Sequence, residues 1–335
     1  MSVASGAAER RSGSASELLR RWFGPSDRAP SRGLRVLAVL TAINTYAVIV
    51  MGGVVRTTGS GLGCDSPTDN GWPLCRGRLL PPLEQDAVIE FTHRWLAATM
   101  SVLLVALVAT VALRYRHRRR LLATVLVVTA LLVVQITLGQ LTVQYKLPGS
   151  IVMVHLANAE LLLAAVILTC LIAAGSVAAP FTGSDGDRRR RAAVAWMTAA
   201  TAGVYALVLS GAFVVAQGAG YACNGWPLCG GGFQLDSTRM GQYNVLHRFV
   251  AGAVVVLLGI ALMKIAAAHR QRTGVRVAGG LVTLALLAQV IAGAVLVESR
   301  LPAWTRSVHE ALASALWAAT ILVFLMVRPG AVSAP

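Results

Sequence analysis

Eight long apolar runs, separated by shorter polar or basic segments, follow one another along the chain. A transmembrane helix needs about 20 mostly apolar residues, because each residue advances a helix by only about 1.5 Å. The pattern therefore predicts an all-α membrane protein with eight transmembrane helices. The first run is too long for a signal-peptide core and has no evident small-residue cleavage site, so we expect it to remain as an anchor. The predicted spans are residues 35–55, 88–113, 121–143, 152–173, 192–216, 244–266, 276–297 and 307–327.

Basic residues concentrate in alternate connections between these spans and in the N-terminal tail. Clusters lie at Arg114–Arg120, Arg188–Arg191 and Arg270–Arg276. Cytoplasmic loops retain Lys and Arg, so we predict that both termini are cytoplasmic. The two long loops, 56–87 and 217–243, are then expected on the outer face of the plasma membrane.

Composition agrees with a lipid-embedded chain. Hydrophobic residues make up 56% of the sequence and charged residues only 13%, about half the charged fraction of a soluble protein. The net charge of +16 raises the possibility of nucleic-acid binding, but that function needs a continuous basic face interleaved with aromatic residues. The basic residues here form short separate clusters. The expected partner is therefore the lipid bilayer, and we expect no nucleic acid.

The chain reads as an internal duplication. The motif GWPLC occurs at Gly71–Cys75 and again at Gly225–Cys229, an offset of 154 residues. Before the motif the offset becomes 159, because the second loop is five residues shorter between its cysteines. The offset of 154 also relates His93 to His247, His155 to His309, Gln135 to Gln289, and Gly139 to Gly293.

Four spans per repeat would insert both halves the same way up, with a symmetry axis along the membrane normal. We therefore predict two tandem pseudo-symmetric four-helix bundles. The predicted units are a cytoplasmic tail 1–34, an N-terminal half 35–173, a cytoplasmic linker 174–191, a C-terminal half 192–327 and a cytoplasmic tail 328–335.

Four of the six histidines lie near the outer ends of the second, fourth, sixth and eighth spans, two in each half. A single intramembrane histidine is often a hydrogen-bonded packing residue. Two imidazoles at similar depth on different helices, however, suit the axial ligands of a haem iron in a bundle. Zinc needs three or four ligands, and no nearby residues complete such a set in both halves. We expect each pair to hold a haem: His93 with His155, and His247 with His309.

The halves differ beside the first histidine of each pair. Glu90 precedes His93 by three residues, whereas Asn244 precedes His247. A carboxylate near bilayer depth is costly and usually functional, so Glu90 is the candidate catalytic residue; the alternative is a structural carboxylate. Arg94 could pair with haem propionates. The same holds for Arg248, although snorkelling towards the outer interface explains both arginines nearly as well.

Two cysteines lie in each long outer loop, and an oxidising exterior favours a disulfide within each loop. The expected pairs are Cys64 with Cys75 and Cys223 with Cys229. Such a pair can be a structural staple or can exchange with a partner thiol; the sequence favours the staple. Cys170 lies alone in the fourth span, as a packing residue.

Several short motifs together resemble one family. They are Glu90–Arg94 (EFTHR), Val154–Asn158 (VHLAN), Leu246–Arg248 (LHR), Val308–Glu310 (VHE) and the paired-cysteine loops. With these motifs the chain resembles the haem A synthases, membrane enzymes that oxidise haem O to haem A for cytochrome oxidase. The resemblance covers about residues 35 to 327.

The resemblance implies an oxidoreductase that converts a methyl group of haem O to a formyl group through hydroxylated intermediates. The N-terminal half would take the substrate haem O, and the C-terminal half would hold a haem b cofactor on His247 and His309. Cys64 and Cys75 would also take part in function, although ten residues separate them here, more than in the second pair. Expected partners are the haem O-forming prenyltransferase and cytochrome oxidase assembly factors.

A bis-histidine haem leaves no open iron position for oxygen, so the C-terminal haem is expected to transfer electrons. The main alternative function is a di-haem, cytochrome b-like carrier that takes electrons from a quinol and has no substrate haem. A transporter would need interrupted helices and a midplane site, whereas the histidines here are expected near the outer surface.

Overall fold

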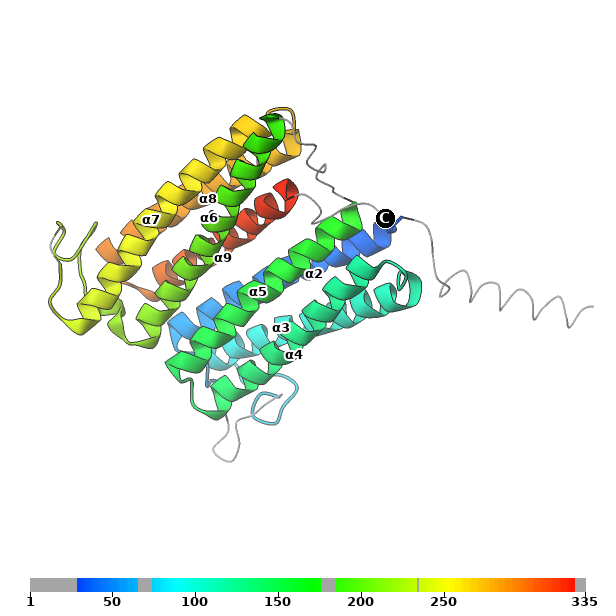
Figure 1. The fold of residues 1–335 in the computed structure, drawn as a ribbon. Helices are drawn as coiled ribbons and strands as arrows, with labels where there is room; N and C mark the ends of the chain where they lie inside the picture. The colour runs from blue at the N-terminus through cyan, green and yellow to red at the C-terminus, as the bar shows by residue number, and fades with distance from the viewer. Residues whose placement is uncertain (1–28, 66–73, 176–184, 234, 329–335) are drawn as a thin grey trace, which may run out of the picture.

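The structure is a computed structural model that describes residues 29–65, 74–175, 185–233 and 235–328 (Figure 1). Within these residues the fold is helical, with eight long helices and one short 3-10 turn, η1, at Ala219–Tyr221. The helices are α2 (Arg32–Thr58), α3 (Gln85–Arg114), α4 (Arg119–Gln144), α5 (Gly149–Ala174), α6 (Asp185–Ala216), α7 (Arg239–Ala268), α8 (Thr273–Glu298) and α9 (Ala303–Val327).

All eight helices are long and apolar enough to cross a membrane. Each contains one of the predicted spans, so the prediction of an all-α protein with eight membrane helices is confirmed. Most helices also extend a few residues beyond the apolar runs. The clearest case is α7, which begins at Arg239 with a polar first turn, where the apolar run begins only at residue 244.

Local sequence explains several helix ends. The Ser31 hydroxyl accepts a hydrogen bond from the backbone N–H of Leu34 at 3.2 Å, and Thr238 caps α7 in the same way through Gly241, as side-chain oxygens do at a helix start. Gly59 ends α2 with a φ of 79°, a left-handed conformation that glycine adopts without steric cost.

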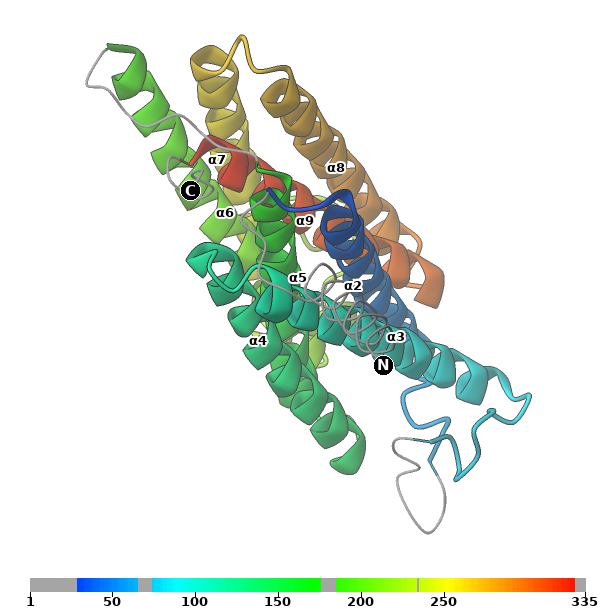
Figure 2. The same ribbon diagram turned by 90° about the vertical axis from the view of Figure 1, so that its right-hand side faces the viewer.

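The helix contacts divide into two sets with a shared boundary. In the first, α2 packs on α3 and α5, and α4 packs on α5 and α3. In the second, α6 packs on α7 and α9, and α8 packs on α9. Across the boundary, α2 contacts α9, and α5 contacts both α6 and α9 (Figure 2). The tandem symmetry of the two bundles and the domain limits stay predictions.

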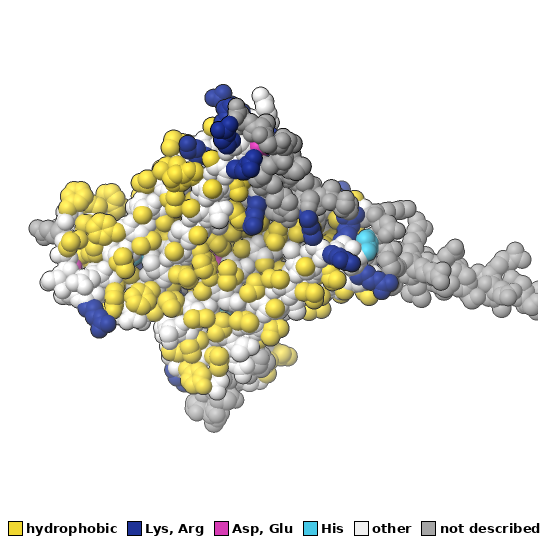
Figure 3. Space-filling model, in the orientation of Figure 1, with side chains coloured by type: hydrophobic (Ala, Val, Ile, Leu, Met, Phe, Trp, Pro, Cys, Tyr) yellow, Lys and Arg dark blue, Asp and Glu magenta, His cyan; other side chains and the backbone are white. Residues whose placement is uncertain are grey.

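The surface of the helices is predominantly apolar. Large aliphatic side chains such as Val102 and Leu284 are more than 60% exposed, which suits contact with lipid better than contact with water. In Figure 3 the Lys and Arg side chains gather mainly at the end of the helices where the α3–α4 and α7–α8 connections lie. That charge asymmetry is the basis for predicting a cytoplasmic location for this end.

Candidate functional site: two histidine pairs beneath the cysteine loops

Each of the four histidines lies against a glycine of the preceding helix. A Cβ atom added at that glycine would come within 3.1 to 3.3 Å of the imidazole Cε1, which is closer than ordinary contact. The missing side chain is therefore what lets the ring occupy the space between the two helices. The four contacts are Gly52–His93, Gly139–His155, Gly211–His247 and Gly293–His309.

The depth of the histidines also repeats between the halves. His93 and His247 each lie eight residues after the first residue of their helix, and His155 and His309 each lie six. At about 1.5 Å per residue these offsets are about 12 Å and 9 Å, roughly two helical turns. The sequence places them within about one turn, because the helices begin before the apolar runs do.

The structure brings the two imidazoles of each half together. His93 and His155 lie within electrostatic range of each other, and so do His247 and His309. In both halves the two rings come from the second and the fourth helix of the repeat. Two imidazoles on different helices of one bundle are compatible with axial ligation of a single haem iron.

A glutamine contacts the second histidine of each pair. Gln135 Nε2 lies 3.2 Å from His155 Nε2, and Gln289 Nε2 lies 3.3 Å from His309 Nε2. In the first half the Asn158 amide also donates to Gln135 Oε1 at 2.7 Å. In the second half Gln289 Oε1 is buried without a hydrogen-bond partner among the described residues. Both halves therefore have the glutamine–histidine contact, but only in the first half does a second amide hydrogen-bond to the glutamine.

Three of the four imidazoles keep a buried nitrogen without a hydrogen-bond partner in the part of the chain that the structure describes. These atoms are Nδ1 of His93, His155 and His309. The fourth, His247 Nδ1, lies 2.7 Å from the hydroxyl of Ser210. Buried polar atoms are rarely left unsatisfied unless a ligand or an ion completes the site. Paired, partly buried imidazoles with incompletely satisfied nitrogens fit the ligand set of a haem iron.

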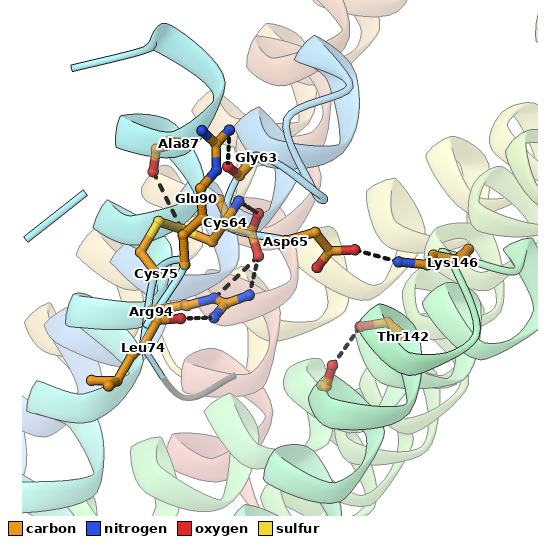
Figure 4. A network of polar contacts seen from close by, with 12 residues as sticks. Gly63, Cys64, Asp65, Leu74, Cys75, Ala87, Glu90, Arg94, Thr142 and Lys146 are labelled. Atoms are coloured by element: carbon orange, nitrogen blue, oxygen red, sulfur yellow. Dashed lines mark hydrogen bonds and ion pairs between the residues drawn. A yellow bond between two sulfur atoms is a disulfide. The ribbon is translucent and has the colours of Figure 1, made fainter. Parts of the chain in front are cut away.

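Glu90 anchors the first disulfide-bonded loop to α3 (Figure 4). Its Oε2 accepts a hydrogen bond from the backbone N–H of Cys64 at 2.8 Å, and its Oε1 accepts one from Arg94 Nε at 3.1 Å. Arg94 also donates to the carbonyl oxygen of Leu74 at 2.5 Å. Glu90 is only 3% exposed. Its carboxylate is therefore held in place from both oxygens, beside the helix turn that carries His93.

The second half repeats this anchor with a neutral amide. Asn244 Nδ2 donates to the carbonyl oxygen of Ala219 at 3.1 Å, and Asn244 Oδ1 accepts from Arg248 Nε at 3.1 Å. Arg248 also donates to the carbonyl oxygen of Cys223 at 2.8 Å. Both arginines thus direct donors at loop carbonyls, which gives them a structural task. Contact of Arg94 or Arg248 with haem propionates stays a prediction.

Both predicted disulfides are confirmed. Cys64 bonds Cys75 and Cys223 bonds Cys229, with Cα–Cα distances of 4.4 and 4.9 Å, and all four are buried. Cys170 is a free, partly buried thiol. Each bridge lies over the helix that carries the first histidine of its pair.

Two ion pairs involve residues of the first disulfide-bonded loop. Lys146, in the α4–α5 connection, lies 2.5 Å from Asp65. Arg76 donates to Glu84 at 2.8 Å and lowers the pKa of that exposed carboxyl. Together with the Glu90 anchor, these contacts attach the loop both to α3 and to the neighbouring helix hairpin.

Two acidic residues between the halves are absent from the sequence-based site. Glu310, directly after His309, pairs with Arg56 of α2 at 2.5 Å, and it lies against Gly53. Glu160 of α5 is fully buried and accepts a hydrogen bond from Ser314 of α9. The sequence signal for Glu160 was a single acidic residue within an apolar run. Glu310 belongs to the VHE motif, in which the sequence assigned a role only to the histidine.

The fold and the site define a multi-pass membrane protein with two internally repeated histidine pairs, each beneath a disulfide-bonded loop. Residues 35–88 and 84–321 match the model of the cytochrome oxidase assembly protein family (COX15-CtaA). Because the match covers most of the sequence, the chain belongs to this family.

Individual relatives carry a more specific name. A "Heme A synthase" of Shouchella clausii is 28% identical over 290 residues, which cover 84% of this chain and 92% of that protein. The "Heme A synthase" of Alkalihalophilus pseudofirmus is 25% identical over 300 residues, covering 88% of this chain and 98% of the relative. That of Geobacillus kaustophilus is 28% identical over 302 residues, with coverages of 88% and 92%.

Proposed function

We propose that the chain is a haem A synthase, a membrane oxidoreductase that converts a methyl group of haem O to the formyl group of haem A. The main support for the proposal is the fourfold repetition of one arrangement, in which a partly buried imidazole lies against a glycine, two in each half. Relatives over 84% or more of the chain bear the name of this activity. Two haem sites are what an enzyme needs if one haem is substrate and another accepts electrons.

The two halves have different tasks in this proposal. The first half binds haem O between His93 and His155, and the second holds haem b between His247 and His309. The support is one difference beside otherwise equivalent histidines: Glu90 contacts its loop where the second half has Asn244. When bound, haem b supplies an iron that accepts and passes on electrons. The N-terminal half, which has the carboxylate of Glu90, is therefore the half suited to oxidise haem O.

Glu90 acts in this scheme as a fixed negative charge beside the substrate. With water as the source of the formyl oxygen, converting a methyl to a formyl group releases four protons and passes four electrons to an acceptor. Positive charge builds up near the reacting carbon. A carboxylate held by Cys64 N–H and Arg94 cannot swing away, so it is preorganised to stabilise that charge. Gly52 and Gly139 let the two imidazoles lie between the helices and hold the substrate in one orientation.

The location and partners follow from the same proposal. The basic end of the helices faces the cytoplasm, and the two disulfide loops face the outside of the plasma membrane, where oxidising conditions maintain them. Haem O is a lipid-soluble product of a prenyltransferase in the same membrane, so we propose direct or lateral delivery from that enzyme. The enzyme would then pass haem A to cytochrome oxidase assembly factors.

Pigment analysis separates this function from its alternative. The purified enzyme should yield haem b together with haem O, haem A or a hydroxylated intermediate on acid extraction and chromatography. A di-haem quinol carrier would yield haem b alone. Protein produced in cells that make haem O, but carrying haem b only, would overturn the proposed function in favour of the carrier.

A further inference from the structure

Glu160 is a buried carboxyl group at the boundary between the two halves. It is the one acidic residue of α5, and its side chain is fully buried against α9. Ser314 Oγ donates to Glu160 Oε1 at 2.5 Å, and the indole N–H of Trp317 donates to the Glu160 backbone carbonyl at 2.8 Å. The residue thus joins the helix that carries His155 to the helix that carries His309.

Glu160 and Ser314 occupy equivalent positions in the two repeats. The offset of 154 residues that relates His155 to His309 also relates Glu160 to Ser314. Each lies five residues after the histidine of its own helix, about 7.5 Å further along the helix axis. A contact between equivalent positions lies where the two halves meet. The carboxyl group is five residues from the histidine of its own helix and contacts the helix that carries His309.

The surroundings of Glu160 contain polar groups and little compensating charge. Tyr46 of α2 and Tyr205 of α6 lie within electrostatic range of it, and their hydroxyls donate to the backbone carbonyls of Ala311 and Ala157. Glu160 Oε2 is buried and has no hydrogen-bond partner in the described ranges.

The other charge facing the site from α9 is itself acidic. Glu310 lies within electrostatic range of Glu160 and is already paired with Arg56 of α2. Among the described residues no ion pair reaches the Glu160 carboxyl group. A carboxyl group in this setting has no fixed cation to balance it, so a proton is the charge that can do so.

An intramembrane carboxyl group without a cation is costly and usually marks a proton or ion pathway. In a low-dielectric interior, adding negative charge nearby strongly favours proton binding at such a group. Resting on the proposed function, we propose that Glu160 is the proton site that compensates an electron held by a haem on the second histidine pair. Glu160 would bind one proton from water when a one-electron reductant reduces a haem held by His247 and His309, and would release it when a one-electron oxidant removes that electron. The two charges cancel; the electron comes from the haem O methyl group in turnover, or from a chemical reductant in the test.

The first test is a redox titration of the purified full-length protein loaded with haem b, from about pH 6 to about pH 9. Uptake of one proton per electron changes the reduction equilibrium tenfold per pH unit, which is about 59 mV for one electron. We expect this dependence in the wild type and a much weaker one in Glu160→Gln, which keeps the shape of the side chain. Ser314→Ala is the matched control, because it removes the hydrogen bond and keeps the titrating group; its dependence should persist.

The second test does not require the Gln variant to fold. The reduced-minus-oxidised infrared spectrum of the wild type should contain a carbonyl band from a protonated carboxylic acid, and Ser314→Ala should shift that band because Glu160 Oε1 loses its donor. Equal pH dependence in the wild type and Glu160→Gln, or a wild-type spectrum without a band that responds to Ser314→Ala, would overturn the inference alone. Purified protein that binds no haem b would overturn the proposed function together with it.

Discussion

Glu90 and Asn244 hold equivalent places in the two halves, and each accepts a hydrogen bond at 3.1 Å from the Nε of an arginine one helical turn later. Both positions also hold a disulfide-bonded loop. The backbone N–H of Cys64 donates to Glu90, whereas Asn244 donates to the carbonyl oxygen of Ala219. The same scaffold is therefore built once around a charge and once around a neutral amide. A residue needed only to anchor the loop has no reason to be charged in one half alone.

Replacing Glu90 with Gln separates the two roles. The amide still accepts one of the two hydrogen bonds, so we expect normal protein level and normal haem b content. Turnover should fall roughly a hundredfold, as when a preorganised electrostatic group is removed, and haem O or a hydroxylated intermediate should accumulate. The measurement is haem extraction and chromatography from cells with the variant as their only copy. Asn244→Ala, which disturbs the anchor of the other loop, controls for loosening of a loop. Normal haem A with Glu90→Gln would make the carboxylate a structural residue.

Replacing a histidine of the first pair and replacing one of the second pair should have different effects on the bound haem. His247→Ala removes a ligand of the second pair, so the low-spin haem b spectrum of the purified protein should disappear. His93→Ala should leave that spectrum in place while abolishing haem A formation. Visible spectra of the two purified variants make the comparison. An unaltered haem b band in His247→Ala would show that haem b is held elsewhere.

The glycines beside the histidines offer a test that changes no ligand. A Cβ at Gly293 would lie 3.2 Å from His309 Cε1, whereas a Cβ at Gly280 of the same helix meets nothing within 4 Å. Both changes to Ala favour the helix by about 1 kcal/mol. We therefore expect Gly293→Ala to lower haem b occupancy or shift its spectrum, and Gly280→Ala to leave it unchanged. Equal haem content in both variants would contradict the packing of His309 against α8.

The disulfides predict the pattern of thiol labelling. Unreduced, denatured protein should be modified at Cys170 and at none of the four loop cysteines. Cys223→Ser should destabilise the folded loop by about 2 kcal/mol, the entropic effect of losing a bridge over a short segment. Mass spectrometry of labelled peptides gives the pattern, and the yield of folded protein gives the effect. Labelling of all five cysteines would show that the bridges do not form.

Much of the fold follows from hydropathy, because the apolar runs correspond to helices one by one. The helix ends do not follow from it. Residues such as Arg239 and Gln242 are too polar for a hydropathy window, yet they continue α7 outwards. As a result, the histidines lie about one turn deeper than the apolar runs suggest.

The sequence predicts the site residues that the 154-residue repeat relates to an identical residue, and, apart from Glu90, it does not predict those without an identical counterpart. Equal spacing identified the histidines, and the same offset related Gln135 to Gln289 and Gly139 to Gly293 before the structure gave them a role. Gly52 and Gly211 follow a different offset, because the loops between them and the histidines differ in length. The repeat did not identify Glu160, because its counterpart is Ser314. Only the packing of α5 on α9 brings the two residues together.

The central claim is that this chain makes haem A, and the most direct measurement is haem analysis of cells that produce haem O and carry this chain as their only candidate enzyme. Membranes are extracted with acidified solvent, and the haems are separated by chromatography, with His93→Ala as the matched negative control. We expect haem A with the wild-type chain, and haem O without haem A with the variant. Haem O and haem b alone with the wild-type chain would contradict it.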